Sequence, residues 1–158
     1  MQTRLWRLIK DEEQLNEEKL KEAAVLIREG EVVAFPTETV YGLGANGLNG
    51  NAVRKIFAAK GRPADNPLIL HIAEKREIEK LTTGLSANAQ ALMQAFWPGP
   101  LTLVVPKSSI IPDEVSAGLA TVAVRMPVHP VARKLIGLAG CPIAAPSANK
   151  SGKPRPTN

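Results

Sequence analysis

The sequence predicts an α/β domain whose sheet is at least partly parallel. Short apolar runs alternate along the chain with segments in which apolar residues recur at helical spacing. Glycine, proline and asparagine separate these segments, as they do at turns and helix ends. With 158 residues, of which 44% are hydrophobic and 22% charged, the chain is long enough to bury a core of its own.

The N-terminal part predicts two strands separated by a helix. Residues 5–9 predict a short first strand. Residues 31–35 predict a second strand, nearly all apolar and therefore expected to be buried on both faces. Between them, Gly30 is expected to end a helix. That helix is predicted from the helical spacing of three apolar residues: Leu20, Ala24 and Ile27.

The next stretch, residues 36–51, is rich in glycine and asparagine and predicts a loop. Within it, Gly42 and Gly44 permit close backbone approach or a positive φ. Asn51 is then expected to cap a short helix. After a second loop that contains two prolines, the apolar residues 68–72 predict a third strand.

Two further helices and three strands complete the predicted domain. Ser86 caps the first helix, which ends at the segment 97–100, and Pro130 lies in the first turn of the second helix. The apolar residues of the first helix include Ala89, Leu92 and Phe96, and in the second helix Val131, Leu135 and Leu138 are expected on one face. The remaining strands are predicted at residues 101–105, 121–126 and 143–145.

Composition narrows the class of protein. No apolar run reaches the roughly 18 residues that a membrane span needs, and residues 1–10 do not resemble a secretory signal, so a cytoplasmic location is expected. The single cysteine, Cys141, excludes an intramolecular disulfide and is expected to be a small buried apolar residue. The net charge of +5 suits an anionic ligand or weak contact with nucleic acid, whereas 4% aromatic residues argue against a stacking platform for single strands.

Polar residues just after the predicted strands are the candidates for a site, because ligands of open α/β sheets gather at the carboxyl ends of strands. Thr37 and Thr39 offer hydroxyls and Tyr41 an aromatic wall; the alternative is a tight turn whose hydroxyls bond their own backbone. Lys60 ends the second helix, and with Arg62 it forms a cation pair that suits a phosphate group. The alternative there is a solvated basic helix end.

Two strand residues and one strand end add further candidates. His71 lies inside an apolar strand, where a lone histidine is more often structural than catalytic. Thr121 and Arg125 share one strand face, and a buried arginine requires an anionic partner, from either the protein or a ligand. Ser147 and Asn149 can bind phosphate oxygens or a ribose. The surroundings of this serine are not a Gly-x-Ser-x-Gly elbow, and no P-loop pattern occurs, so neither of those enzyme classes is favoured.

Taken together and in order, six segments resemble the threonylcarbamoyl-AMP synthase family, which has a YrdC-like domain. The resemblance covers residues from about Ala23 to Asn149, and six ordered matches are far more specific than any single one. The matching segments are Pro36-Thr37-Glu38-Thr39-Val40-Tyr41-Gly42-Leu43, Lys60-Gly61-Arg62-Pro63, Asn66-Pro67-Leu68, Trp97-Pro98-Gly99-Pro100-Leu101-Thr102, Val122-Ala123-Val124-Arg125-Met126-Pro127 and Ala145-Pro146-Ser147-Ala148-Asn149.

The resemblance implies a twisted open mixed sheet flanked by helices, YrdC/RibB-like, with a concave basic cavity. It implies a nucleotidyltransferase that makes threonylcarbamoyl-AMP from L-threonine, bicarbonate and ATP with release of pyrophosphate. A downstream tRNA-modification machinery would use the product for the threonylcarbamoyladenosine modification at tRNA position 37. Residues 1–149 would be the catalytic domain, without the C-terminal strands of longer relatives. Residues 150–158 would be a basic, proline-rich tail or the start of the next segment.

The same resemblance assigns roles to residues. The threonine contacts it implies are Thr37, His71, Arg125 and the backbone of Ala145. The ATP contacts it implies are Lys60, Arg62, Thr121, Ser147 and Asn149, with Arg155 as a further contact. Lys60 and Arg62 would act in catalysis by charge stabilisation, since the motifs contain no convincing general base. Mg²⁺ would be held mainly by the nucleotide, because no acidic cluster in the sequence resembles a metal site built by protein ligands.

Two other functions remain as alternatives. A double-stranded RNA or tRNA binder would use the basic concavity, and its affinity would fall steeply with salt. A carbamoyl-transfer domain of the hydrogenase-maturation type would be accompanied by an acylphosphatase-like segment or zinc-finger cysteines. The single cysteine argues against the second alternative.

Overall fold

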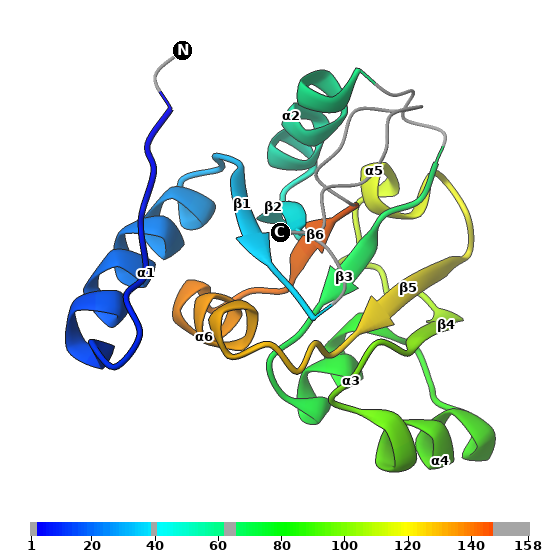
Figure 1. The fold of residues 1–158 in the computed structure, drawn as a ribbon. Helices are drawn as coiled ribbons and strands as arrows, with labels where there is room; N and C mark the ends of the chain where they lie inside the picture. Colours follow the sequence, from blue (N-terminus) through cyan, green and yellow to red (C-terminus); the bar gives the residue numbers. More distant parts are fainter. Residues whose placement is uncertain (1–2, 39–40, 62–65, 147–158) are drawn as a thin grey trace.

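The computed structural model describes residues 3–38, 41–61 and 66–146, which form one sheet with helices against both of its faces (Figure 1). The strands are β1 (Val33–Pro36), β2 (Tyr41–Asn46), β3 (Ile69–His71), β4 (Thr102–Pro106), β5 (Thr121–Arg125) and β6 (Ile143–Ala145). The helices are α1 (Glu13–Arg28), α2 (Gly50–Lys60), α3 (Ile78–Leu81), α4 (Ala87–Phe96), α5 (Asp113–Ser116) and α6 (Pro130–Ala139), with a 3-10 helix, η1 (Lys75–Glu77), before α3.

The sheet is open and mixed, as the family resemblance implied. Its strands lie in the order β1-β2-β6-β3-β5-β4. Among the described strands, β3 and β5 form the one parallel pair, and every other neighbouring pair is antiparallel. The partly parallel sheet is therefore confirmed, although antiparallel pairing dominates it.

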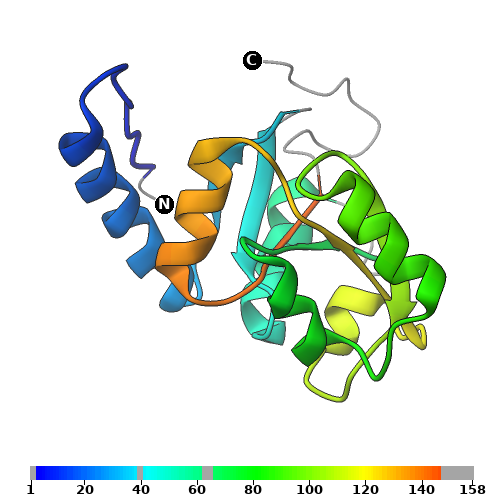
Figure 2. The same cartoon turned by 90° about the horizontal axis from the view of Figure 1, so that it is seen from below.

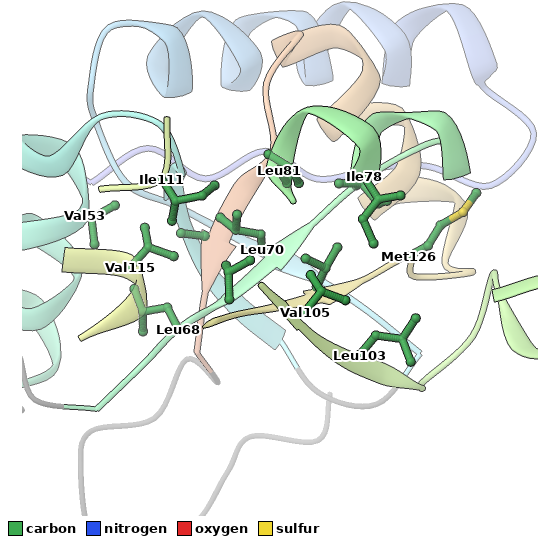
Figure 3. Packing of buried hydrophobic residues seen from close by; sticks show 14 of the residues in the cluster. Val53, Leu68, Leu70, Ile78, Leu81, Leu103, Val105, Ile111, Val115 and Met126 are labelled. Atoms are coloured by element: carbon green, nitrogen blue, oxygen red, sulfur yellow. The ribbon is translucent and has the colours of Figure 1, made fainter. Parts of the chain in front are cut away.

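Each face of the sheet has its own hydrophobic core. Figure 2 shows α1 and α6 on one side of the sheet and α3, α4 and α5 on the other. The core under α1 and α6 includes Ile27, Phe35, Leu135, Ile136 and Ile143. The core under α2, α3, α4 and α5 is larger, and Figure 3 shows residues such as Val53, Leu70, Ile78, Val105 and Val115 packed together there.

The face under α1 and α6 is covered over only part of its width. No residue of β4 or β5, as the structure describes them, belongs to the core on that face. Instead, Thr121 and Ala123 of β5 are half-buried, and Val104 of β4 is 67% exposed. Among the described residues of β4 and β5 on this face, Thr121, Ala123 and Val104 are therefore only partly covered, whereas Arg125 at the end of β5 is buried.

The first residues of the chain and the β1–β2 region differ from the predictions. Residues 5–9 form no strand. β1 is an edge strand with Ala34 exposed, so the prediction that it is buried on both faces is wrong. The predicted loop contains strand β2, because its glycines give room to neighbours: a Cβ on Gly44 would lie 2.5 Å from the Ile143 side chain and 2.6 Å from that of Phe35. Close approach, one of the two expected roles of these glycines, is confirmed there.

The predictions of helix ends agree with the structure better than the predictions of which helix residues are buried. Gly30 has a φ of +89° after α1, Ser86 caps α4 by accepting from the Ala89 N–H at 3.0 Å, and Pro130 opens α6. The cap of α2 is Asn49 and not the predicted Asn51. Of the apolar residues noted for this helix, Leu92 and Phe96 are exposed, and the buried residue of α4 is Met93.

The helix α6 also turns a different face to the core than the spacing predicted. Leu135 is buried as expected, whereas Val131 and Leu138 are only half-buried. The other buried positions are Ala132, Ile136 and Ala139. Of the helices in the described part of the chain, none has the length and apolarity needed to cross a membrane.

Candidate functional site

His71 and Arg125 lie side by side on one face of the sheet. They are register partners at the C-terminal ends of the parallel strands β3 and β5, and register partners on adjacent strands point to the same face. Ile69, two residues before His71, pairs with Ala145 of β6, and Thr121 lies four residues before Arg125. Since strand side chains alternate, four of the predicted site residues share this face.

Arg125 is buried, with 7% of its surface exposed, and acceptors of the protein surround its guanidinium. Its Nη2 donates to Glu38 Oε1 at 2.5 Å, and its Nε donates to the Gly99 carbonyl at 3.3 Å. The other carboxylate oxygen of Glu38 accepts from the Val128 N–H at 2.7 Å. The anionic partner that the sequence required is therefore, in this structure, a carboxylate of the protein.

Glu38, the partner of Arg125, is not among the site residues that the sequence predicted. A signal was present, because Glu38 is the one acidic residue in the segment 36–43 and this segment follows a strand. A buried arginine needs a carboxylate. The sequence left open whether that partner belongs to the protein or to a ligand, and no local pattern links Glu38 to an arginine 87 positions away.

His71 is a neutral, buried imidazole. It is 4% exposed, and its Nδ1 lies 3.1 Å from the Ile69 carbonyl and 3.2 Å from the Ile143 carbonyl. Burial, and then the charge of Arg125, lower the pKa of His71 to about 4. Because both neighbours of Nδ1 are acceptors, we assign the proton to Nδ1, which makes Nε2 the accepting nitrogen at neutral pH.

The two remaining described candidates lie at the ends of two other elements, β1 and α2. Thr37 directly follows β1 and is half-buried. Lys60 is the last residue of α2 and is only 4% exposed, and Gly61 ends the helix in the left-handed conformation with φ 65°. A solvated basic helix end, the alternative interpretation of this segment, is therefore wrong for Lys60.

The predicted nucleotide contacts are only partly within the described residues. Arg62, Ser147, Asn149 and Arg155 lie outside them. Thr121 lies at the start of β5, four residues from Arg125, which corresponds to about 13 Å along an extended strand. The two described contacts on β5, one predicted for the nucleotide and one for threonine, are thus at opposite ends of the strand.

Metal ligands, the single cysteine and a cavity could also be parts of a site. The described residues hold no group of three or more His, Cys, Asp or Glu residues that could bind a metal ion. Burial raises the pKa of the half-buried Cys141 to about 11, which favours its thiol over the nucleophilic thiolate at neutral pH. A cavity of about 450 Å³ is lined by residues of η1, α3 and α4, on the face opposite to His71, and has no part in this site.

The buried arginine and the neutral histidine lie adjacent at strand ends of an α/β protein with an open mixed sheet, and sheets of this class bind their ligands at the carboxyl ends of strands. A model of the Sua5/YciO/YrdC proteins, described as telomere recombination, matches residues 25–158. The chain belongs to this family.

Relatives with high sequence identity are known. The chain is 60% identical to the threonylcarbamoyl-AMP synthase of Pyrococcus abyssi, over 96% of this chain and 44% of the relative. It is 57% identical to the enzyme of the same name from Bacillus subtilis, over 99% of this chain and 46% of the relative. The solved structure of P. abyssi Sua5 with L-threonine superposes with a TM-score of 0.87 at 62% identity, over 89% of this chain and 41% of that one. The chain thus spans less than half the length of these relatives.

Proposed function

We propose that this chain contains the catalytic site of a threonylcarbamoyl-AMP synthase. In the proposed reaction, the amine of L-threonine adds to bicarbonate with loss of water and gives a carbamate. A carbamate oxygen then attacks the α-phosphate of ATP, and the bond to the β-phosphate breaks to release pyrophosphate. The names of both curated relatives support this activity, and the L-threonine in the solved relative supports the amino-acid substrate.

The adjacency of His71 and Arg125 is the observation that carries the proposal. The guanidinium of Arg125 can bind the carboxylate of threonine, and the accepting Nε2 of a neutral His71 can receive a hydrogen bond from the hydroxyl or amine of the same ligand. Thr37 and the backbone of Ala145 would complete this subsite.

The nucleotide part of the site would be basic. We assign charge stabilisation of the departing pyrophosphate to Lys60 and Arg62, and contacts with the nucleotide to Thr121, Ser147, Asn149 and Arg155. Mg²⁺ would be bound by the phosphates of ATP. Since a pKa lowered to about 4 makes the imidazole of His71 a weak base, we propose that orientation and charge stabilisation, without a general base, drive the reaction. The product would be passed to the tRNA-modification machinery in the cytoplasm.

The test is to incubate the protein with ATP, bicarbonate and L-threonine and to detect threonylcarbamoyl-AMP by mass spectrometry and pyrophosphate enzymatically. Arg125→Lys replaces the planar fork by a point charge. We expect it to raise the KM for threonine at least about tenfold, on the scale of one lost charged hydrogen bond, with the KM for ATP nearly unchanged.

A matched control is available for this variant. Arg54 also pairs with a glutamate at 2.5 Å, but on the surface of α2, so Arg54→Lys is expected to leave both KM values unchanged. Pyrophosphate release that does not depend on threonine would contradict the proposed function. An unchanged threonine KM in Arg125→Lys would contradict the role assigned to that residue.

A further inference from the structure

Glu38 joins two parts of the chain that are far apart in the sheet. It follows β1, at one edge, while its partners Arg125 and Val128 lie at the end of β5 and just beyond it. Four strand positions separate β1 from β5, a width of about 19 Å at the usual strand spacing. Figure 1 shows the chain leaving β1 and running toward the ends of β3 and β5, where Glu38 makes these contacts.

The pair formed by Glu38 and Arg125 is shielded from solvent. The side chains of Arg125 and Glu38 are 9% and 19% exposed, respectively. In such surroundings a guanidinium without a carboxylate is costly, so the orientation of Arg125 depends on the charge of Glu38. The Gly99 carbonyl on Nε and Glu38 on Nη2 together fix the plane of the guanidinium.

We propose that Glu38 is a positioning residue for recognition of the amino-acid carboxylate, an inference that rests on the proposed function. Its Oε1 orients Arg125, and its Oε2 holds the segment after β1 against the segment after β5. Thr37, next to Glu38 in the chain, is thereby held near the same ligand. A guanidinium has five N–H donors in a planar fork, a geometry that allows a protein carboxylate and a ligand carboxylate to bind the same arginine.

The opposite role would be that of a competitor, in which Glu38 occupies Arg125 and must leave before the ligand binds. The contact with Val128 favours positioning, because Glu38 also binds the backbone there and its release would break two hydrogen bonds. The two roles predict effects of opposite sign when the charge is removed. If Glu38 is a competitor, removing its charge should make threonine bind more tightly. If Glu38 is a positioning residue, removing its charge should make threonine bind more weakly.

The experiment compares Glu38→Gln and Glu38→Asp with the parent protein. Glutamine removes the charge and replaces one of the two accepting oxygens by an NH2 group. Either Arg125 or Val128 then loses the acceptor of its N–H. We expect Glu38→Gln to raise the KM for L-threonine at least about tenfold, with kcat and the KM for ATP changed less than about threefold. Glu38→Asp keeps the charge and is expected to recover part of the loss.

Two controls separate positioning from general stability. Glu114→Gln removes a carboxylate of nearly equal exposure, 20%, from an arginine at the same distance of 2.5 Å, and is expected to leave the threonine KM unchanged. L-Threoninamide lacks the carboxylate, so Glu38→Gln should change its inhibition constant less than about twofold, as in a double-mutant cycle.

Three results would overturn the inference: unchanged or tighter threonine binding in Glu38→Gln, equal weakening of threonine and threoninamide, and the same threonine defect in Glu114→Gln. Calorimetric titration with L-threonine tests the inference separately from catalysis. A parent protein that binds threonine but makes no product contradicts the proposed function and leaves the Glu38 comparison measurable. A parent that does not bind threonine overturns both.

Discussion

At the scale of single residues, His71 shows how burial fixes a protonation state. Its Nδ1 faces two carbonyl oxygens, from Ile69 and Ile143, and its ring packs edge-on against Phe35 with 6.0 Å between ring centroids. The apolar neighbourhood and the nearby charge of Arg125 both disfavour the imidazolium. The histidine therefore acts as a donor at one nitrogen and an acceptor at the other across the physiological pH range.

This state predicts a dependence of stability on pH. The pKa of His71 is about 4 in the folded protein and near 6.5 in the unfolded chain, so the unfolded chain takes up the proton first as the pH falls. The contribution of neutral His71 to the free energy of unfolding is fully present above pH 6.5 and is lost as the pH falls from 6.5 to about 4. Between pH 7 and pH 4.5 we expect a loss of about 2 to 3 kcal/mol in the free energy of unfolding from this residue.

The measurement compares the parent with His71→Asn, which keeps an N–H near the position of Nδ1 but does not titrate. Urea unfolding at pH 7 and pH 4.5 gives the free energy of each protein, and carboxylates common to both cancel in the difference. The parent should lose more stability than the variant. Equal losses in the two proteins would show that the pKa of His71 is not lowered by folding.

The sequence predicted the need of Arg125 for an anion but not the anion itself. That need follows from an arginine placed within an apolar strand, which is a local pattern. The identity of Glu38 as its partner does not follow, because the two residues are 87 positions apart and meet only after the sheet has formed. The shared face of His71 and Arg125 likewise depends on the register between β3 and β5.

At the scale of elements, two asparagines near the N-terminus of α2 have different roles, and only one of them caps the helix. Asn49 Oδ1 accepts from the Ala52 N–H at 3.2 Å, whereas Asn51 Oδ1 accepts from Arg54 on the exposed surface. Asn49→Ala should therefore cost about 1 kcal/mol of stability, and Asn51→Ala less than about 0.5 kcal/mol. Urea unfolding of both variants checks this, and a larger loss in Asn51→Ala would favour the cap predicted from the sequence.

The strands were harder to predict than the helix ends, for a physical reason. A cap is decided by one residue and the next turn, so Ser86, Gly30 and Pro130 could be recognised locally. The strand β2 contains glycines that strands usually avoid, and they fit because Phe35 and Ile143 occupy the space beside Gly44. The exposure of Ala34 depends on β1 being at the edge of the sheet, which is a property of the whole topology.

At the scale of the whole molecule, two hydrophobic cores share a single sheet. A single layer of strands separates the core under α1 and α6 from the core under α2, α3, α4 and α5. Both cores include residues of β6. Ile143 and Ala145 belong to the first core and Ala144 to the second. Neither layer can therefore lose its packing without disturbing the strand that the other layer packs against.

This shared sheet predicts that the two layers unfold together. Leu135 of α6 is 1% exposed in one core, and Trp97 is 3% exposed in the other, which makes its fluorescence a reporter of the opposite layer. Leu135→Ala should destabilise the protein by about 2 to 5 kcal/mol. In a Trp6→Phe background, the urea midpoint reported by Trp97 should fall as much as the midpoint reported by far-ultraviolet circular dichroism, because unfolding is one transition. If the Trp97 midpoint stays at the parent value while the circular dichroism midpoint falls, the layers unfold independently and the sheet does not couple them.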